Sequence, residues 1–554
     1  MLGSPPQNAA DDDVPWFIDA ITGETRTRAQ VKILADSLAR GLRTHFRFQR
    51  DYSDIATTQT FDLQSSSSPS QNRTKGSKYN IGSVVSIVSP NNVDFGACVW
   101  ACHKIGCTVA PSNAGSTVDE LTHQFRLTGA QVIITHPNAF SSVLRAARAV
   151  GIPDGRIVVL GNREVISDDL AGFLTIQDLV DINITAGDPS DNISAECQIA
   201  FLCFSSGTTG LPKAVVIPHE AVIANVNQVA STAIPGSRAS PGDKALGVIP
   251  LSHMYGLLTL LHLCPHLGIS SVLYPGMPPF EPFLDSLENL RVNHLFLAPP
   301  LVNAFLKHPA AQGRDLSFFK TCLVAAAPLD ADREDAFRNL CGPNLLLSQA
   351  FGMTETAGLV TSLFPGAQPI SGTVGRLVPS TEAKILDSEG RPVSAGERGE
   401  LFVRGPQLCL GYLNNENENR LAFDDQGFLR TGDEVVMLPS GDIRVMDRLK
   451  NIIKHKGFQV SPAELEGHIL LHPFVEDVGV VGRPDERAGE TPVAFVVLSS
   501  SGKDAAQFDE DHVKDTIQDH VRRAKSQYKW LGDVFFVNAI PRLPSGKILL
   551  RELR

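Results

Sequence analysis

A segment of small hydroxyl residues and glycines that ends in a cation carries the clearest chemical signal in this sequence. It runs Phe204-Ser205-Ser206-Gly207-Thr208-Thr209-Gly210-Leu211-Pro212-Lys213 and follows an apolar run, 199–203, that predicts a buried strand. Glycines let backbone N–H groups close around an anion, and the hydroxyls and Lys213 add donors and charge, so this segment can hold phosphates. A surface turn has the same composition. The spacing matches neither the P-loop nor G-x-G-x-x-G.

The sequence SSGTTGLPK resembles the phosphate loop of the adenylate-forming superfamily. This superfamily includes acyl-CoA synthetases, 4-coumarate–CoA ligases, luciferases and peptide-synthetase adenylation domains. Other signatures of this family follow in order: F-G-M-T-E at 351–355, T-G-D at 431–433 and P-S-G-K at 544–547. The resemblance extends from about the first predicted strand to the end of the chain and is closest to 4-coumarate–CoA ligase-like enzymes. It implies ATP, Mg²⁺ and coenzyme A as cofactors and a small-molecule carboxylic acid as substrate.

The resemblance also implies which residues bind the nucleotide. In the family the aromatic residue of F-G-M-T-E stacks on adenine, its Thr contacts the α-phosphate, and the Asp of T-G-D holds the ribose with help from Arg448. A carboxylate beside a triphosphate needs a hard divalent ion between them, so Glu355, with Thr209, is predicted to bind Mg²⁺. The predicted nucleotide-binding residues are Ser205, Ser206, Gly207, Thr208, Thr209, Gly210, Lys213, Ala326, Ala327, Pro328, Gln349, Ala350, Phe351, Gly352, Met353, Thr354, Asp433 and Arg448.

Residues expected to surround the carboxylic acid carry no acidic group. Val324 and Ala325 replace the Ser and Gly that relatives have before Ala-Ala-Pro, and we expect both to take volume from the pocket. His253 stands where many CoA ligases carry a histidine and where amino-acid-activating domains carry an aspartate; the alternative for a lone His is a structural role. The predicted pocket consists of His253, Met254, Tyr255, Gly256, Val324, Ala325, Leu359 and Val360. An α-ammonium would lack a partner there, which favours an aryl or medium-chain acid.

The last hundred residues contain lysines that the resemblance places in the two half-reactions. Lys450 matches the family's hinge, and Lys456 and Gly457 lie on the loop that meets coenzyme A, although a solvated basic edge also explains these lysines. Lys547 is predicted to bridge the acid carboxylate and the α-phosphate, because attack of one anion on another needs a compensating charge. The predicted catalytic residues are Lys547, Thr354, His253 and Lys454.

Alternating apolar runs and helical patterns predict an α/β protein with several parts. We expect an N-terminal adenylate-forming domain over 1–449, with two α/β layered subdomains, the second starting at the phosphate loop, and a β-rich subdomain after Gly372. A swinging α+β domain covers 450–554. Residues 1–13 and 51–80 predict a disordered lead and a flexible insertion. Helices are predicted over 25–42, 94–104 and 511–523.

Composition excludes several classes of function. A formal net charge of -11 over 554 residues does not suit a nucleic-acid-binding surface. The chain shows no basic-then-apolar leader, no uninterrupted membrane-spanning run and no S-K-L ending, so we expect a cytoplasmic protein, or a peroxisomal one if the C-terminus was trimmed. Cys98, Cys102 and Cys107 lack paired metal-site spacing and are expected in the core rather than at zinc.

These observations predict an ATP-dependent carboxylate–CoA ligase that forms acyl-AMP and transfers the acyl group to coenzyme A. An enzyme that loads a carrier-protein thiol would share every motif. A luciferase-like oxygenase and a non-catalytic nucleotide-binding protein are further alternatives, although a sensor has no need of Lys547.

Overall fold

The computed structural model describes residues 12–46, 48, 60–62, 78–161, 170–182, 198–205, 212–234, 236–455, 458–485, 488–542, 546 and 548–553. Several predicted site residues lie outside these ranges: Ser206, Gly207, Thr208, Thr209, Gly210, Lys456, Gly457 and Lys547. The predicted lead and most of the predicted insertion also lie outside them. Two short pieces of the insertion are described, and they pair as antiparallel strands, β3 (Thr60–Asp62) and β4 (Lys78–Asn80).

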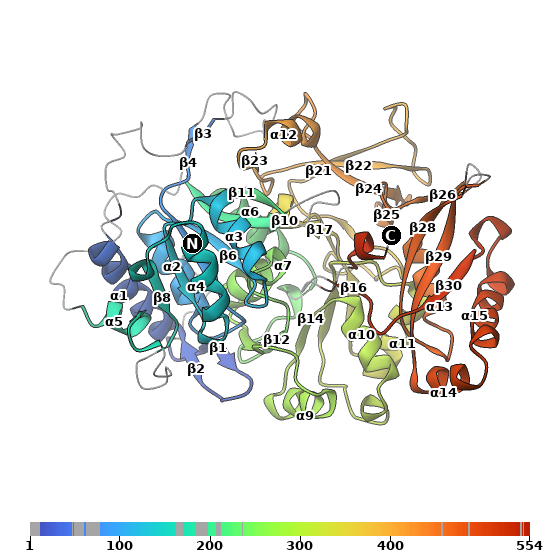
Figure 1. Ribbon diagram of the computed structural model, residues 1–554, viewed down its shortest axis with the longest axis horizontal. Helices are drawn as coiled ribbons and strands as arrows, with labels where there is room; N and C mark the ends of the chain where they lie inside the picture. The colour runs from blue at the N-terminus through green and yellow to red at the C-terminus, as the bar shows by residue number, and fades with distance from the viewer. Residues whose placement is uncertain are drawn as a thin grey trace.

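The first sheet contains the strands on either side of the phosphate loop (Figure 1). Its order is β23 (Gly411–Tyr412), β11 (Lys213–Pro218), β10 (Ile199–Ser205), β6 (Thr108–Ser112), β5 (Val84–Val88), β7 (Val132–Thr135), β8 (Ile157–Val159) and β9 (Leu174–Thr175). β5 and β7, in the parallel part of the sheet, are buried along their whole length, as parallel strands covered by helices are. The helices between them are α2 (Phe95–Lys104), α3 (Val118–Thr128), α4 (Phe140–Ala149) and α5 (Ile176–Val180).

The second sheet carries the next two signature segments at the ends of its strands. Its order is β16 (Leu346–Gln349), β15 (Thr321–Val324), β14 (His294–Leu297), β12 (Lys244–Gly247), β13 (Ser270–Leu273), β1 (Pro15–Asp19) and β2 (Thr25–Thr27). All pairs are parallel except β1 with β2. The associated helices are α6 (His219–Ala230), α7 (Met254–Gly256), the π-helical η6 (Leu257–Leu263), α8 (Cys264–Leu267), α9 (Phe280–Leu290), α10 (Pro299–Lys307) and α11 (Ala331–Cys341).

Two boundaries differ from the sequence-based expectation. The phosphate-loop strands do not open the second α/β subdomain, because β10 pairs with β6 of the first sheet through Phe201 and Val109, while the second sheet takes in β1 from the N-terminus. Strand order is set by long-range pairing, which local apolar patterning does not encode. The first helix, α1 (Arg28–Phe46), begins and ends later than expected, because Thr25–Thr27 pairs with β1 as an edge strand.

The rest of the chain forms two further large sheets, seen at the top and right of Figure 1. Two two-stranded sheets precede them: β17 (Gly352–Met353) with β18 (Gly358–Leu359), and β19 (Thr361–Ser362) with β20 (Arg376–Leu377). The β-rich part orders β21 (Glu382–Leu386), β22 (Arg398–Arg404), β24 (Leu429–Met437) and β25 (Ile443–Arg448), and α12 (Glu416–Ala422) lies beside it. The last sheet contains β27 (Phe458–Val460), β26 (Ile453–His455), β29 (Gly489–Leu498), β28 (Val475–Asp485) and β30 (Asp533–Phe536), with α13 (Pro462–Ile469), α14 (Ser500–Phe508) and α15 (Glu510–Ala524). The predicted fold class is confirmed.

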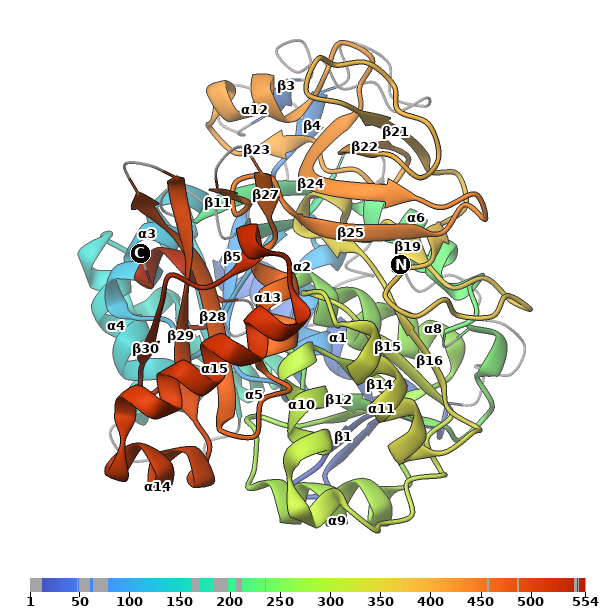
Figure 2. The same ribbon diagram turned by 90° about the vertical axis from the view of Figure 1, so that its right-hand side faces the viewer.

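Contacts between the last sheet's unit and the second sheet's helices hold these parts together. The ammonium of Lys307 on α10 donates to the carbonyls of Val475 and Glu476 at 2.7 and 3.1 Å. The guanidinium of Arg333 on α11 donates to the carbonyl of Gly467 on α13 at 2.8 Å. Figure 1 and Figure 2 show α13 close to α10 and α11, and α15 packs on α13. Burial and, to a smaller degree, the nearby Arg333 charge lower the pKa of Lys307 to about 8.

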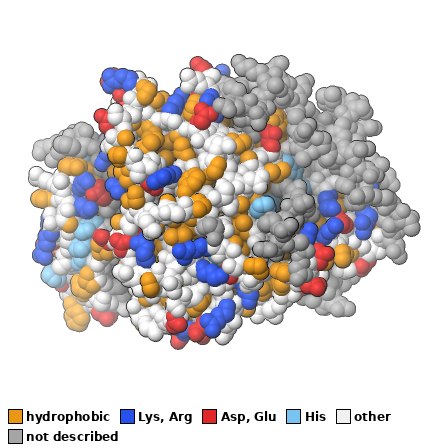
Figure 3. Space-filling view, turned by 180° about the vertical axis from the view of Figure 1, so that it is seen from behind, with side chains coloured by type: hydrophobic (Ala, Val, Ile, Leu, Met, Phe, Trp, Pro, Cys, Tyr) orange, Lys and Arg blue, Asp and Glu red, His pale blue; other side chains and the backbone are white. Residues whose placement is uncertain are grey.

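The described residues contain no helix long and apolar enough to cross a membrane. Cys98, Cys102 and Cys107 are all buried and belong to the main hydrophobic cluster, as expected for small core residues. On the face shown in Figure 3, basic and acidic side chains are interspersed with apolar ones.

A glycine in α1 permits close packing against α5. A β-carbon on Gly41 would overlap the carbonyl oxygen of Leu179. Gly41→Ala should therefore lower the free energy of unfolding by about 1–3 kcal/mol, the usual cost of overpacking, measured by urea titration. Gly155→Ala is the control, since a β-carbon there meets nothing within 4 Å. A Gly41→Ala variant as stable as wild type would contradict this packing.

Candidate active site

Two predicted binding segments, Ala325–Pro328 and F-G-M-T-E at 351–355, follow neighbouring strands of the second sheet. Val324 on β15 pairs with Gln349 on β16 in parallel register. Because parallel strands end at the same edge of a sheet, Ala325–Pro328 and Ala350–Glu355 leave that edge side by side. Open α/β sheets bind ligands in a crevice at this kind of edge, beyond the carboxyl ends of the strands.

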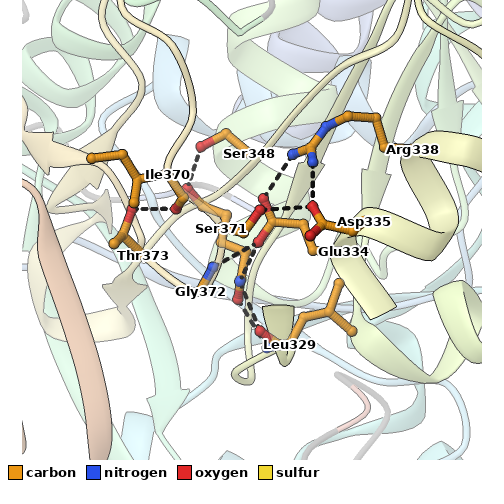
Figure 4. A network of polar contacts seen from close by, with 10 residues as sticks. Leu329, Glu334, Asp335, Arg338, Ser348, Ile370, Ser371, Gly372 and Thr373 are labelled. Carbon is orange, nitrogen blue, oxygen red and sulfur yellow. Dashed lines mark hydrogen bonds and ion pairs between the residues drawn. The ribbon is translucent and has the colours of Figure 1, made fainter. Parts of the chain in front are cut away.

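A buried amide holds the two segments together. The Gln349 side chain accepts from the backbone N–H of Leu329 at 2.8 Å and donates to the Leu329 carbonyl at 2.8 Å. It also donates to Glu334 at 2.9 Å, and Glu334 in turn accepts from the N–H of Gly372 at 3.0 Å. Figure 4 shows Glu334 at the centre of this network, with Arg338 on one side. Burial raises the pKa of Glu334.

Gln349 was predicted to bind nucleotide. The structure instead uses its side-chain oxygen and nitrogen in hydrogen bonds to Leu329 and Glu334. The Ala325–Pro328 segment that these bonds hold is strained. Ala326 has φ 75°, a left-handed conformation that is unusual for a residue with a β-carbon. Such strain persists only where the surroundings enforce it, and it is characteristic of ligand-binding segments.

Glu355 is positioned by a tyrosine that sequence reasoning missed. Its side chain is only 6% exposed, and its Oε1 accepts a hydrogen bond from the Tyr412 hydroxyl at 2.9 Å. Burial and the adjacent carboxylate raise the pKa of Tyr412, so the phenol stays a neutral donor. A carboxylate that accepts one such bond keeps lone pairs for a hard cation, so Glu355 fits the predicted Mg²⁺.

The same tyrosine contacts the phosphate-loop lysine. Tyr412 on β23 pairs with Val215 on β11, and the Lys213 ammonium lies 5.2 Å from the centroid of its ring. Lys213 also pairs with Ser205 across β10 and β11, and its ammonium is 2.7 Å from Oε2 of Glu418 on α12. The structure thus brings Lys213 over the ring of the phenol and Glu355 to its hydroxyl. No sequence signal singled out Glu418, because an acidic residue in a first helical turn is ordinary.

The predicted ribose pair is brought together by antiparallel pairing. Asp433 on β24 lies opposite Arg448 on β25, with Nε of the guanidinium 3.4 Å from Oδ1 of the carboxylate. Asp433 is 3% exposed. A buried carboxylate beside a cation remains an acceptor, which two vicinal hydroxyls require.

Only some of the residues predicted for the acid pocket share one hydrophobic core in the structure. Met254, Tyr255, Ala325, Leu359 and Val360 belong to one hydrophobic cluster. The Tyr255 hydroxyl donates to the Leu323 carbonyl at 2.8 Å, which fixes α7 against β15. At the start of α7, Nδ1 of His253 accepts from the N–H of Tyr255 at 3.4 Å. A β-carbon on Gly256 would overlap the Pro250 carbonyl.

Val324 is the exception. Its side chain is fully buried in a different cluster, with Phe305 and Phe337 under α10 and α11. Side chains alternate between the faces of a strand, so Val324 points away from the face that Leu323 and Ala325 share. The expectation that Val324 takes volume from the acid pocket is therefore wrong; Ala325 remains a candidate.

The other C-terminal residues are placed as follows. Lys450 lies in the turn between β25 and β26, where the chain passes from the β-rich sheet to the last sheet. Lys454 is exposed on β26, and its backbone N–H donates to Glu490 at 2.8 Å. Gly546, which precedes Lys547, lies near the crevice: a β-carbon there would be 3.3 Å from Cβ of Ala298, the residue after β14.

Comparison with known proteins gives the same assignment. Residues 76–413 match the family model described as "AMP-binding enzyme", and residues 464–547 match "AMP-binding enzyme C-terminal domain". The chain is 36% identical over 486 residues to 4-coumarate–CoA ligase 2 of Oryza sativa subsp. japonica, covering 85% of this chain and 83% of that protein. It is 36% identical over 491 residues to acyl-CoA ligase AKT1 of Alternaria alternata, covering 85% and 82%.

Among solved structures, the fold is similar to that of the anthranilate CoA ligase AuaEII in complex with anthranoyl-AMP. The TM-score is 0.79 at 22% identity, covering 98% of this chain and 94% of that one.

The hydrogen bonds of the Gln349 side chain can be tested by mutation. Gln349→Leu leaves the Leu329 backbone groups and one oxygen of Glu334 without this partner, and each lost bond to a buried group costs about 1–3 kcal/mol. We expect a higher KM for ATP and a free energy of unfolding lowered by at least about 2 kcal/mol. Gln312→Leu removes an exposed amide as the control. An unchanged KM for ATP would show that these hydrogen bonds do not shape the nucleotide site.

The motifs, the fold and these matches all lead to one conclusion: the chain belongs to the AMP-binding enzyme family, as the resemblance implied.

Proposed function

We propose that this protein is an ATP-dependent carboxylate–CoA ligase that works through an acyl-adenylate. The observation that carries this proposal is that Lys213 and Glu355, from segments far apart in the chain, both contact Tyr412, one over its ring and the other at its hydroxyl. A phosphate-binding cation and a metal-binding carboxylate around one side chain suit a magnesium–triphosphate complex. Family membership and relatives named as CoA ligases support the same activity.

In the proposed first half-reaction, a carboxylate oxygen of the acid attacks the α-phosphorus of ATP. The bond from the α-phosphorus to the bridging oxygen breaks, and pyrophosphate leaves with the electron pair. Asp433 and Arg448 orient the ribose, Ala326–Pro328 and Phe351 flank adenine, and Thr354 contacts the α-phosphate. Mg²⁺ held by Glu355 and Thr209 would neutralise phosphate charge. Lys547 offsets the repulsion between the two reacting anions.

In the proposed second half-reaction, the sulfur of coenzyme A attacks the acyl carbon, and AMP leaves as a thioester forms. Lys450 serves as the hinge at which the unit over 450–554 reorients, and Lys454, Lys456 and Gly457 then face coenzyme A. The turn at Lys450, between two sheets, supports this role, because a change in φ and ψ there moves one sheet relative to the other.

The proposed substrate is an aryl or medium-chain acid. Met254, Tyr255, Ala325, Leu359 and Val360 are buried members of the main hydrophobic core, so the lining expected for the acid is apolar. Relatives named for 4-coumarate favour the aryl class. Each CH₂ buried in such a pocket contributes about 0.8 kcal/mol, roughly fourfold in kcat/KM.

The test is a pyrophosphate-release assay over benzoate, cinnamate, hexanoate, octanoate, palmitate and phenylalanine, each with and without coenzyme A. We expect aryl or medium-chain acids to have the highest kcat/KM and thioester to appear only with coenzyme A. A clear preference for phenylalanine or palmitate would refute the assigned acid class. Acyl-AMP that reacts with a carrier-protein thiol but not with coenzyme A would refute the acceptor.

Lys547 is predicted to act mainly in adenylation. Lys547→Ala should slow acyl-AMP formation by roughly a hundredfold or more, the scale of losing one group that stabilises transition-state charge. Thioester formation from supplied acyl-AMP should survive. Lys503→Ala, an exposed lysine of the same C-terminal unit, is the control. An equal loss in both half-reactions would mean that Lys547 has another role.

A further inference from the structure

The ammonium of Lys213 already has an anionic partner in this structure. Oε2 of Glu418 lies 2.7 Å from it, and both side chains are largely shielded, at 19% and 35% exposure. Charge-assisted contacts of this length are stronger than neutral hydrogen bonds, and salt screens them where the pair is partly exposed. A phosphate that binds Lys213 must therefore compete with Glu418.

The position of Glu418 is fixed by the surrounding backbone. Asn415 caps α12 and accepts from the N–H of Glu418 at 3.3 Å. One turn along, the Asn419 side chain accepts from the N–H of Tyr412 at 2.6 Å and donates to its carbonyl at 3.0 Å. Tyr412 is itself paired with β11, the strand that begins at Lys213. Helix, tyrosine and lysine therefore form one hydrogen-bonded unit.

Two carboxylates thus flank the place where the triphosphate is expected. Glu355 is held by the Tyr412 hydroxyl, and Glu418 pairs with Lys213, which lies over the ring of the same tyrosine. Glu355 has a use for its charge, since a hard cation can join it to a phosphate. The charge of Glu418 lowers the net positive charge that Lys213 presents, and it repels the incoming anion.

We propose that Glu418 sets the affinity for MgATP, by serving as the resting counter-ion of Lys213 that a phosphate of the nucleotide displaces. This inference rests on the proposed function, because it takes MgATP as the ligand. Glu418 touches neither the acid nor the α-phosphorus in this scheme, so it acts on nucleotide binding through Lys213 and leaves the chemical step alone.

The test replaces the charge and keeps the shape. Glu418→Gln in the full chain should lower the KM for MgATP about threefold to fivefold, the range of one partly exposed ion pair. The values of kcat and of the KM for the acid and for coenzyme A should not change. Glu418→Ala should shift the KM for MgATP in the same direction, since it also removes the charge.

Glu416→Gln is the matched control, because Glu416 lies on the same helix, carries the same charge and is exposed. The difference between Glu418→Gln and wild type should shrink as salt is raised, whereas a purely structural effect would persist. An unchanged or increased KM for MgATP in both Glu418 variants overturns the inference.

Direct calorimetric titration of MgATP separates the two levels of the argument. If wild type binds MgATP and releases pyrophosphate with an acid, but Glu418→Gln binds like Glu416→Gln, only the role of Glu418 fails. If wild type neither binds MgATP nor releases pyrophosphate with any acid, the proposed function fails.

Discussion

Parallel pairing between β15 and β16 is the constraint on which the site depends. It brings the segment after Val324 and the segment after Gln349 to one edge, although the two are separated by α11. The Gln349 side chain accepts from and donates to the backbone of Leu329, which ties the first segment to the end of β16. The strained Ala326 lies within the segment that is held in this way. The conformation of this segment, which is predicted to contact the nucleotide, therefore depends on the pairing of the strands as well as on its own residues.

Charge imposes a second constraint. Lys213, Glu355 and Glu418 all gather around Tyr412, an uncharged side chain that contacts a cation through its ring and an anion through its hydroxyl. A phenol can do both because its ring face is electron-rich and its hydroxyl is a donor. Lys213 and Glu355 thus both contact this one neutral side chain, while Lys213 also pairs directly with Glu418.

Much of this was predictable from the sequence, for identifiable reasons. The signature segments lie in continuous stretches, so their residue types and order predicted the family, the fold class and the pairing of Asp433 with Arg448 in one site. Tyr412 and Glu418 were not predicted, because their roles come from strand β23 adding to β11 at the sheet edge. The face of β15 to which the Val324 side chain points is set by the alternation of side chains along the strand. The replacement of the relatives' Ser by Val324 did not show which face that is. The assignment of β10 to the first sheet required long-range pairing.

The contacts of Lys307 and Arg333 with the C-terminal unit have an evolutionary consequence. Both cations bind carbonyl oxygens, of Val475, Glu476 and Gly467, and every residue type provides that group. These three hydrogen bonds therefore place no requirement on the side chains of their acceptor residues, and substitutions at those positions can accumulate as long as the backbone path is retained.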